Sequence, residues 1–121
     1  MVMCVDDSPS ICSKMKRILE GAGYRFIAVS DPIQALPLMS EKKPELLLID
    51  LVMPVIGGYE LTSQIRRIPA FQHTPLIIFS GNMLDRIRAK LAGANDTLSK
   101  LVSAEEILAM VERWLPVSTS V

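Results

Sequence analysis

The sequence has few cysteines, no excess charge of either sign and no long apolar run. Its 121 residues include 13 basic and 13 acidic side chains, so no overall field directs the chain toward nucleic acid or an anionic membrane. No apolar stretch approaches the roughly 20 residues that cross a bilayer, and no secretory signal pattern opens the sequence. We therefore expect a cytoplasmic protein that binds neither a membrane nor nucleic acid directly.

Metal sites made of cysteine and histidine are excluded by the same scarcity. Cys4 lies in a predicted strand and Cys12 lies one turn into a predicted helix, so we expect two buried free thiols. The single histidine, His73, lies in a loop before a predicted strand and is expected to be solvated. Without a Cys/His cluster, a zinc site is not expected.

Short apolar runs and helical periodicities alternate along the whole chain. The predicted strands cover residues 1–5, 25–30, 45–50, 76–80 and 97–100, and the predicted helices cover residues 9–22, 32–40, 59–68, 83–91 and 104–115. Pro37 is expected to kink the second helix. The alternation predicts one α/β domain over residues 1–116, a doubly wound parallel sheet of five strands flanked by five helices. Residues 117–121 would be a C-terminal tail or the start of a linker.

Acidic side chains follow two of the predicted strands. Asp6 and Asp7 come directly after the first strand, and Asp50 ends the third. The carboxyl ends of parallel strands meet at one edge of the sheet, so these three carboxylates are expected to lie together. They would repel one another unless a cation neutralised them, and hard divalent cations such as Mg²⁺ take oxygen ligands. The sequence therefore predicts a magnesium site centred on Asp50.

Two further polar side chains are expected at the same edge. Ser80 ends the fourth predicted strand, and Lys100 ends the fifth. A carboxylate, a metal, a hydroxyl and an ammonium together suit phosphoryl transfer to Asp50, which would act as a nucleophile and form an acyl phosphate. The metal and Lys100 would neutralise the phosphoryl oxygens, and Ser80 would donate a hydrogen bond.

With these residues in place, essentially the whole chain resembles the response-regulator receiver domains of two-component signalling, which have the CheY-like, flavodoxin-like fold. Four separated segments carry the resemblance in the family's order: VDDSPS, LLLIDLVMPVIGGYEL, PLIIFSGN and GANDTLSK. The resemblance implies the strand order 2-1-3-4-5. It also implies that the only catalysis is Mg²⁺-dependent self-phosphorylation from phosphodonors and self-dephosphorylation.

The resemblance assigns roles to the residues at the sheet edge. Asp50 would be the phosphoacceptor, Ser80 the switch hydroxyl and Lys100 the phosphate-contacting lysine. Besides Asp50, the Mg²⁺ ligands would be Asp7 directly, Asp6 directly or through water, and the backbone carbonyl of Val52.

The resemblance also implies partners. The phosphodonor would be a histidine kinase or a phosphotransfer protein, and a downstream protein would bind through the fourth helix, the fifth strand and the fifth helix. A weak dimer is a further expectation, although the mixed charges of the fourth and fifth helices favour plain solvated faces over a dimer seam.

Three positions depart from the family's pattern. Thr97 stands where an aromatic ring usually swings inward on phosphorylation, so the usual rotamer relay is missing or altered. Leu101 follows Lys100 where the family usually has proline after a cis peptide bond. A non-proline cis bond costs about 3 kcal/mol, so this bond is either strained or trans with a shifted loop. The Val55-Ile56-Gly57-Gly58 segment lacks an acidic residue before its last glycine, a mild change because the turn needs glycine more than a carboxylate. We therefore expect intact phosphorylation chemistry and a modified switch.

Three alternatives compete with a phosphorylated receiver. A pseudo-receiver, an interaction module that signals without phosphorylation, is favoured by Thr97 and Leu101 but not by the complete acidic site. A haloacid-dehalogenase-like phosphatase typically has a second aspartate two residues after the nucleophile, where this chain has Val52, and a cap domain for which the chain has no room. A flavodoxin-type nucleotide binder needs a glycine-rich phosphate loop after the first strand, which the sequence lacks.

Overall fold

The computed structural model describes residues 1–80 and 82–117. Along the chain its elements are β1 (Val2–Val5), α1 (Pro9–Gly21), β2 (Phe26–Val29), the 3₁₀ helix η1 (Pro32–Gln34), α2 (Ala35–Lys42), β3 (Leu46–Asp50), α3 (Gly58–Arg66), the 3₁₀ helix η2 (Pro69–Phe71), β4 (Leu76–Phe79), α4 (Met83–Ala92), β5 (Asp96–Leu98) and α5 (Ala104–Trp114). The five strands form one parallel sheet in the order β2-β1-β3-β4-β5. The predicted fold class and strand order are therefore confirmed. Residues 118–121 of the expected tail lie outside the described residues.

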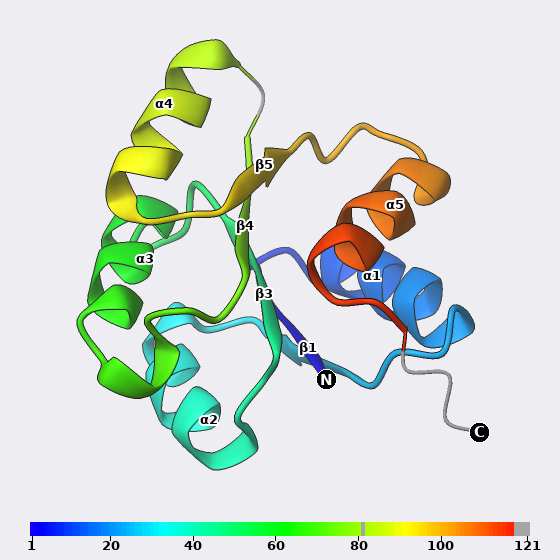
Figure 1. The fold of residues 1–121 in the computed structure, drawn as a ribbon, viewed down its shortest axis with the longest axis horizontal. Helices are drawn as coiled ribbons and strands as arrows, with labels where there is room; N and C mark the ends of the chain where they lie inside the picture. Colours follow the sequence, from blue (N-terminus) through cyan, green and yellow to red (C-terminus); the bar gives the residue numbers. More distant parts are fainter. Residues whose placement is uncertain (81, 118–121) are drawn as a thin grey trace.

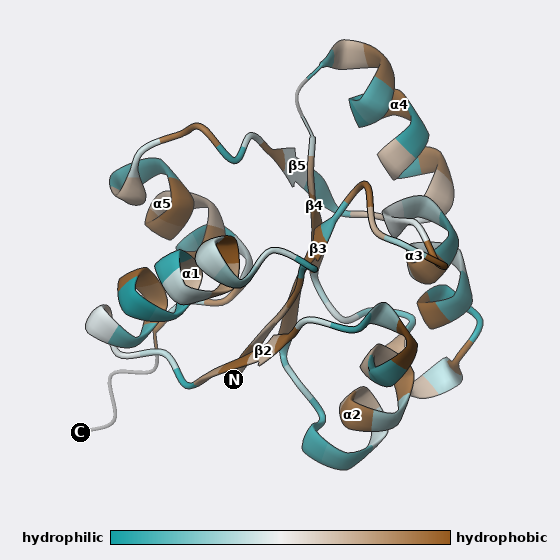
Figure 2. Cartoon of the chain, turned by 180° about the vertical axis from the view of Figure 1, so that it is seen from behind, coloured by the Kyte–Doolittle hydropathy of each residue, from teal (hydrophilic) through white to brown (hydrophobic). Residues whose placement is uncertain are grey.

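The sheet lies between two layers of helices (Figure 1). α1 and α5 cover one face, and α2, α3 and α4 cover the other. Successive residues of a strand point to opposite faces, so β1 directs Val2 and Cys4 toward α1 and α5, and Met3 and Val5 toward α2 and α3. Because β1, β3 and β4 are buried on both faces, they are continuous apolar runs in the sequence and largely brown in Figure 2.

Side-chain caps start three of the α-helices close to the sheet edge. Ser8, Asn82 and Ser103 each accept a hydrogen bond from a backbone N–H in the first turn of α1, α4 and α5, respectively. Such caps satisfy N–H groups that have no partner inside the helix. Each of these helices begins within a few residues of the end of β1, β4 or β5. The connecting loops are therefore short and lie at one edge of the sheet.

The second helix differs from the prediction. Asp31 and Pro32 start η1 rather than an α-helix, and α2 begins only at Ala35. Pro37 therefore lies in the first turn of α2, where a backbone N–H has no acceptor within the helix and proline is tolerated. The expectation that Pro37 interrupts the interior of a helix is wrong for this reason.

The fifth strand is shorter than predicted. β5 ends at Leu98, so Lys100 lies in the turn that follows this strand. Ser80 also lies outside its predicted strand, because β4 ends at Phe79. Both side chains thus come from loops at the carboxyl edge rather than from the strands themselves. Within the described residues, no helix has the length and apolar character needed to cross a bilayer.

Candidate functional site

Three carboxylates meet at the carboxyl edge of the sheet. Asp6 follows β1 and Asp50 ends β3, and these strands are neighbours, with Val5 paired to Ile49. Asp6, Asp7 and Asp50 each offer a carboxylate oxygen, and these oxygens all lie within 4.8 Å of one another. Asp6 is completely buried and Asp50 is 6% exposed, whereas Asp7 faces solvent. The structure therefore brings together the acidic cluster that the sequence predicts.

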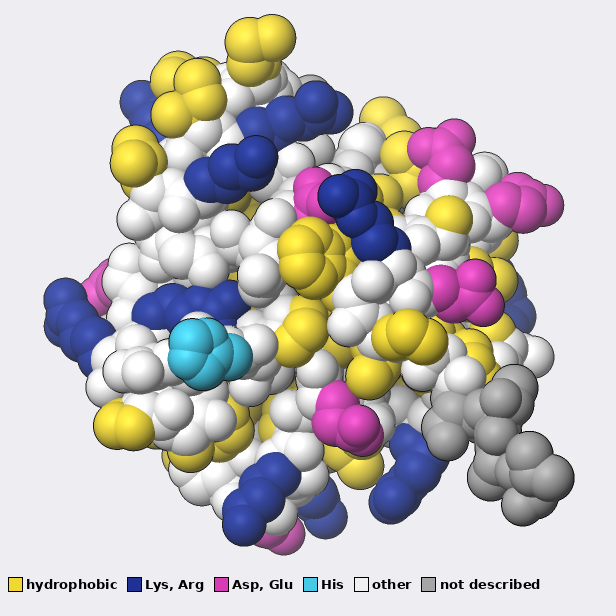
Figure 3. Space-filling view, in the orientation of Figure 1, with side chains coloured by type: hydrophobic (Ala, Val, Ile, Leu, Met, Phe, Trp, Pro, Cys, Tyr) yellow, Lys and Arg dark blue, Asp and Glu magenta, His cyan; other side chains and the backbone are white. Residues whose placement is uncertain are grey.

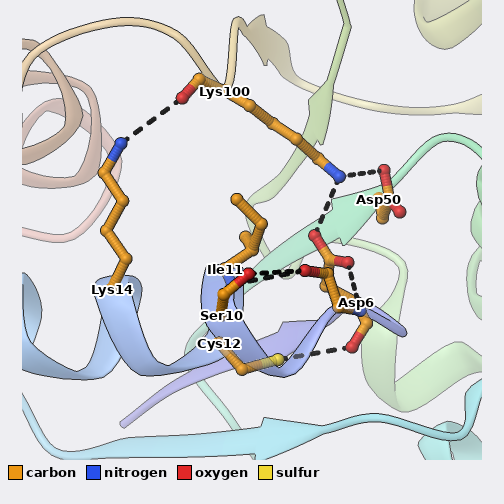
Figure 4. Close-up of polar contacts among 8 residues, drawn as sticks. Asp6, Ser10, Ile11, Cys12, Lys14, Asp50 and Lys100 are labelled. Atoms are coloured by element: carbon orange, nitrogen blue, oxygen red, sulfur yellow. Dashed lines mark hydrogen bonds and ion pairs between the residues drawn. The ribbon is translucent and has the colours of Figure 1, made fainter.

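Lys100 reaches into this cluster from the loop after β5 (Figure 4). Its Nζ lies 2.8 Å from Asp50 Oδ1 and 3.1 Å from Asp6 Oδ2. Burial by itself would lower the pKa of Lys100, but the hydrogen bonds and negative charges of the two carboxylates outweigh burial and raise that pKa above its ordinary value. The lysine is therefore held in its charged form between the two aspartates.

The two oxygens of the Asp6 carboxylate have different partners. Its Oδ1 accepts a hydrogen bond from the backbone N–H of Ser8 at 2.9 Å. Its Oδ2 is buried and, among the described residues, accepts no hydrogen bond of good geometry, although the Lys100 ammonium lies beside it. A buried carboxylate oxygen without a directed donor retains a lone pair for a further ligand.

The two cysteines lie directly beneath the acidic cluster. Cys4 is completely buried on β1, Cys12 is 7% exposed on α1, and both are free thiols, as predicted. A hydrogen bond to Cys12, together with burial, raises the pKa of Cys4 well above its ordinary value. The Cys12 thiol also donates to the backbone carbonyl of Asp6 at 3.3 Å (Figure 4). The thiols therefore form part of the support for the loop that carries Asp6.

An open cavity of about 470 Å³ lies against Asp50 and Lys100. Its lining residues come from the ends of β3, β4 and β5 and the loops after them: Asp50, Leu51, Val52, Phe79, Ser80, Ser99, Lys100 and Leu101. Ser80 is buried at the wall of this cavity, whereas the side chain of Val52 is 77% exposed. The predicted switch hydroxyl thus borders the same space as the predicted phosphoacceptor and lysine.

The loop after Lys100 takes one of the two expected forms. No peptide bond of the described residues is cis, so the Lys100–Leu101 bond is trans. The backbone N–H of Leu101 donates to Ser99 Oγ at 3.2 Å, and Lys14 Nζ donates to the carbonyl of Lys100 at 3.4 Å from α1 (Figure 4). With these contacts, Lys100 reaches both aspartates without a proline after it.

Thr97 lies where the family has an aromatic ring, on β5 between α4 and α5. It is half-buried and lines a cavity of about 340 Å³ whose other lining residues are Arg86, Lys90, Asp96, Met110 and Arg113. No aromatic side chain is among these residues. The described residues around Thr97 therefore provide no aromatic ring in this cavity.

Gly58 begins α3 immediately behind Asp50. Its backbone N–H donates to the carbonyl of Leu51 at 2.8 Å. A Cβ at this position would collide with the carbonyl oxygen of Asp50 and lie 2.9 Å from Leu51 Cα. The close approach of α3 to the end of β3 therefore requires glycine at position 58.

Two residues of the site were not singled out by the sequence pattern. The sequence indicates only that Cys12 is a buried free thiol, and it gives no role to Lys14. Cys12 precedes the inward-facing Met15 and Leu19 of α1 by helical spacing, which indicates a position against β1. No comparable signal exists for Lys14, because its acceptor lies 86 residues away in the sequence.

The donor set fits a hard divalent cation. Its three side-chain ligands are carboxylates, one oxygen of Asp6 lacks a directed hydrogen bond, and Asp7 is open to solvent. Mg²⁺ prefers oxygen ligands and keeps several waters, which an open cluster allows. The arrangement offers a metal site, a nucleophilic carboxylate and a fixed ammonium around one cavity.

Comparisons with known proteins agree with this geometry. Residues 2–112 match the family model described as response regulator receiver domain. The chain is 30% identical over 122 residues to the protein PilG of Pseudomonas aeruginosa, a match that covers 99% of this chain and 90% of PilG. In two other curated relatives the match covers 96% and 12% of the relative's length, so similar sequences occur both nearly alone and within much longer proteins.

Solved structures give the same result. A putative response regulator from Chloroflexus aurantiacus matches with a TM-score of 0.90 at 28% identity, covering 94% of this chain and 95% of that chain. The receiver domain of the sensor histidine kinase PA1611 from Pseudomonas aeruginosa matches with a TM-score of 0.85 at 31% identity, covering 93% of this chain and 94% of that chain. That structure contains a magnesium ion coordinated in the active-site cleft.

Proposed function

Because this chain belongs to the response-regulator receiver family of two-component signalling, we propose that it accepts a phosphoryl group on Asp50 and thereby switches a partner-binding face. The observation that carries the proposal is the Lys100 ammonium, 2.8 Å from Asp50 at the wall of an open cavity. A fixed positive charge beside a carboxylate at a cavity is suited to stabilising phosphoryl oxygens as they approach that carboxylate.

In the proposed reaction, the free carboxylate oxygen of Asp50 attacks the phosphorus of the donor. A new O–P bond forms while the bond from phosphorus to the donor's leaving atom breaks, and the leaving group takes the bonding pair. Lys100 stays on Oδ1 and faces the incoming phosphoryl oxygens, and Ser80 turns its hydroxyl toward one of them. Mg²⁺, held by Asp6, Asp7, Asp50 and the carbonyl of Val52, would supply positive charge against the phosphoryl oxygens.

The partners follow from the family. Receiver domains interact with histidine kinases and with downstream effectors, and we propose a histidine kinase or a phosphotransfer protein as the donor here. For the output we propose the face formed by α4, β5 and α5, with a weak dimer at most. We further propose that the receiver domain spans residues 1–116, with a tail or linker beginning at Val117, and that it acts in the cytoplasm.

A pseudo-receiver is the second candidate, and two positions favour it. Thr97 provides no aromatic ring to move, and Leu101 replaces the usual proline after Lys100. In this case the fold and the binding face would act without phosphorylation. The two candidates differ in a single chemical event, the formation of an acyl phosphate on Asp50.

The test is the intact mass of the chain after incubation with acetyl phosphate and Mg²⁺. We expect a single phosphoryl adduct that is stable in acid and labile in base. The adduct should be missing from an Asp50→Asn variant and from wild type treated with a chelator. An unmodified wild-type mass in the presence of Mg²⁺ would reject the proposal in favour of the pseudo-receiver.

A further inference from the structure

Lys100 lies in the loop of residues 99–103, whose internal hydrogen bonds are short-range. The backbone N–H groups of Leu101 and Val102 both donate to Ser99, at 3.2 Å to its Oγ and 3.4 Å to its carbonyl, respectively. The side chain of Leu101 is 94% exposed, so it adds little packing against the sheet. These contacts shape the loop locally, but they do not fix Lys100 relative to the carboxylates of the site.

A lysine of α1 connects this loop to the body of the molecule. Lys14 Nζ donates a hydrogen bond to the backbone carbonyl of Lys100 at 3.4 Å, across 86 residues of sequence (Figure 4). Among the described residues, this is the one hydrogen bond that joins the backbone of residues 99–102 to another element. α1 is a firm support, because Met15 and Leu19 on its inner side are fully buried.

Lys100 is thus held at its two ends by different groups. Its ammonium contacts Asp6 and Asp50, whereas its backbone carbonyl contacts Lys14, and Figure 4 shows these contacts at opposite ends of the residue. The Lys14 ammonium has no carboxylate of the described residues within 4.0 Å. An ammonium that donates to a carbonyl forms a charge-assisted hydrogen bond, which is stronger than a neutral one. Competing ion pairs therefore do not draw Lys14 away from the loop.

We propose that Lys14 is a positioning residue for phosphoryl transfer, because it holds the backbone of Lys100 where the Lys100 ammonium reaches Asp50. This role rests on the phosphorylation of Asp50 proposed above. The contacts of the ammonium with Asp50 must change when the phosphoryl group joins that carboxylate, whereas the Lys14 contact lies outside the reacting groups and can persist. Misplacing a catalytic group by about 1 Å can slow a reaction by about a hundredfold, so a loop contact of this kind can set the rate.

The experiment compares rate constants for formation of the Asp50 adduct with acetyl phosphate and Mg²⁺, measured by intact mass. Lys14→Met keeps the apolar length of the side chain but removes the donor, and we expect it to slow the reaction about tenfold. Lys14→Arg retains a cationic donor and should recover most of the wild-type rate. A small donor avoids any effect of these substitutions on the docking of a protein partner.

Lys16→Met is the matched control for the loss of charge. Lys16 is an exposed lysine of the same helix and forms no ion pair with a described residue. The chain has a formal net charge of zero, and the face shown in Figure 3 carries both basic and acidic side chains. We therefore expect Lys16→Met to leave the rate unchanged. An equal loss of rate in both methionine variants would overturn the proposal in favour of a general attraction of the anionic donor.

A double variant tests whether Lys14 acts through Lys100. Lys100→Met should itself slow the reaction strongly. Adding Lys14→Met should then produce no further loss, because two residues that act through one contact are not additive. A further loss of the same size in the double variant would overturn the proposal, and so would a wild-type rate in Lys14→Met alone.

Hydrogen exchange provides a measurement that needs no phosphoryl group. In the unphosphorylated chain, the amides of Leu101 and Val102 should exchange at least about threefold faster in Lys14→Met, because the loop loses its contact with α1, and they should be unchanged in Lys16→Met. Circular dichroism should show that both variants melt as folded proteins. Unchanged exchange in Lys14→Met would overturn the proposal. A wild type without an adduct would instead reject the phosphorylation of Asp50, and the exchange rates would still decide whether Lys14 holds the loop.

Discussion

The two sides of the acidic site are supported by very different amounts of structure. Asp6 directly follows β1 and Asp50 ends β3, and these two strands are buried along their whole length and paired on both sides. Lys100 follows β5, an edge strand of three residues of which only Leu98 is buried. Beside β5, α4 buries only Ala89 and stands out from the body of the molecule in Figure 1.

This difference indicates which side of the site can move. The core holds the carboxylates, so their positions tolerate little change. Lys100 is positioned by its two ion pairs and by the loop contacts of Lys14 and Ser99. We therefore expect a change of charge at Asp50 to act most directly on Lys100 and β5, the side with few buried contacts.

The largest expected effect is the loss of stability when a buried leucine on either side of the site is truncated to alanine. Leu48→Ala on β3 should lower the free energy of unfolding by about 3 kcal/mol, because Leu48 is fully buried between two strands. Leu98→Ala on β5 should cost about half as much, because Leu98 lies at the sheet edge where the site can relax. Urea denaturation measures both values, and equal losses would contradict the contrast.

The second effect tests how tightly α3 packs behind Asp50. Gly58→Ala should lower the free energy of unfolding by about 2 kcal/mol, because its Cβ would collide with the backbone of Asp50. Gly21→Ala is the control, since a Cβ there has no neighbour within 4 Å, and it should stabilise α1 by about 0.5 kcal/mol. Thermal unfolding shows whether each variant is more or less stable than wild type. An unchanged stability of Gly58→Ala would show that this side of the site can shift.

The third effect concerns the end of α5 that lies far from the site. Tyr24 donates to the carbonyl of Leu115 at 2.6 Å, and Tyr24→Phe should cost about 1 kcal/mol. Burial, with a smaller contribution from Glu112, raises the pKa of Tyr24. The unfolded chain therefore loses this proton first, near pH 10, and the folded chain loses stability as the pH rises further. Urea midpoints from pH 8 to above 10 should fall less steeply in Tyr24→Phe, and parallel curves would refute the assignment.

The smallest effect concerns the loop beside Asp50. Val55 has a φ of 71°, in a turn closed by the Ile56 N–H and the Pro54 carbonyl at 2.8 Å. A β-branched residue is strained in this region, and Val55 is 80% exposed, so little packing would be lost on its removal. Val55→Gly should therefore raise the free energy of unfolding by about 0.5 kcal/mol, after allowance for the greater freedom of glycine in the unfolded chain. A loss of stability in urea would mean that the valine contributes packing that offsets its strain.

Much of the fold and most of the acidic site could be predicted from the sequence. Parallel strands buried on both faces must be apolar throughout, so the runs before Asp6 and Asp50 identified both the strands and their ends. Ser8 and Ser103 marked helix starts because a cap is a local arrangement within one turn. Since the strand ends of a parallel sheet share an edge, the clustering of the three aspartates followed without coordinates.

The sequence does not predict the features that depend on contacts between segments far apart in the chain. The sequence predicts Pro37 inside a helix because the start signal at Asp31 and Pro32 does not distinguish a 3₁₀ turn from an α-helix. The charges of α4 predict a plain solvated face, whereas in the structure that helix also exposes Met83, Leu84, Ile87 and Leu91. Periodicity shows that a helix has an apolar side but not which side the sheet receives.

The sequence alone thus determined the strands, the helix starts and the three carboxylates at one edge, because these depend on local periodicity and capping. Only the tertiary structure decided the trans bond after Lys100, the contact from Lys14, the fit of Gly58 behind Asp50 and the exposure of the apolar side chains of α4. Each of these depends on how segments far apart in the sequence pack against one another. A one-dimensional pattern contains no distance between such segments, and packing in three dimensions supplies it.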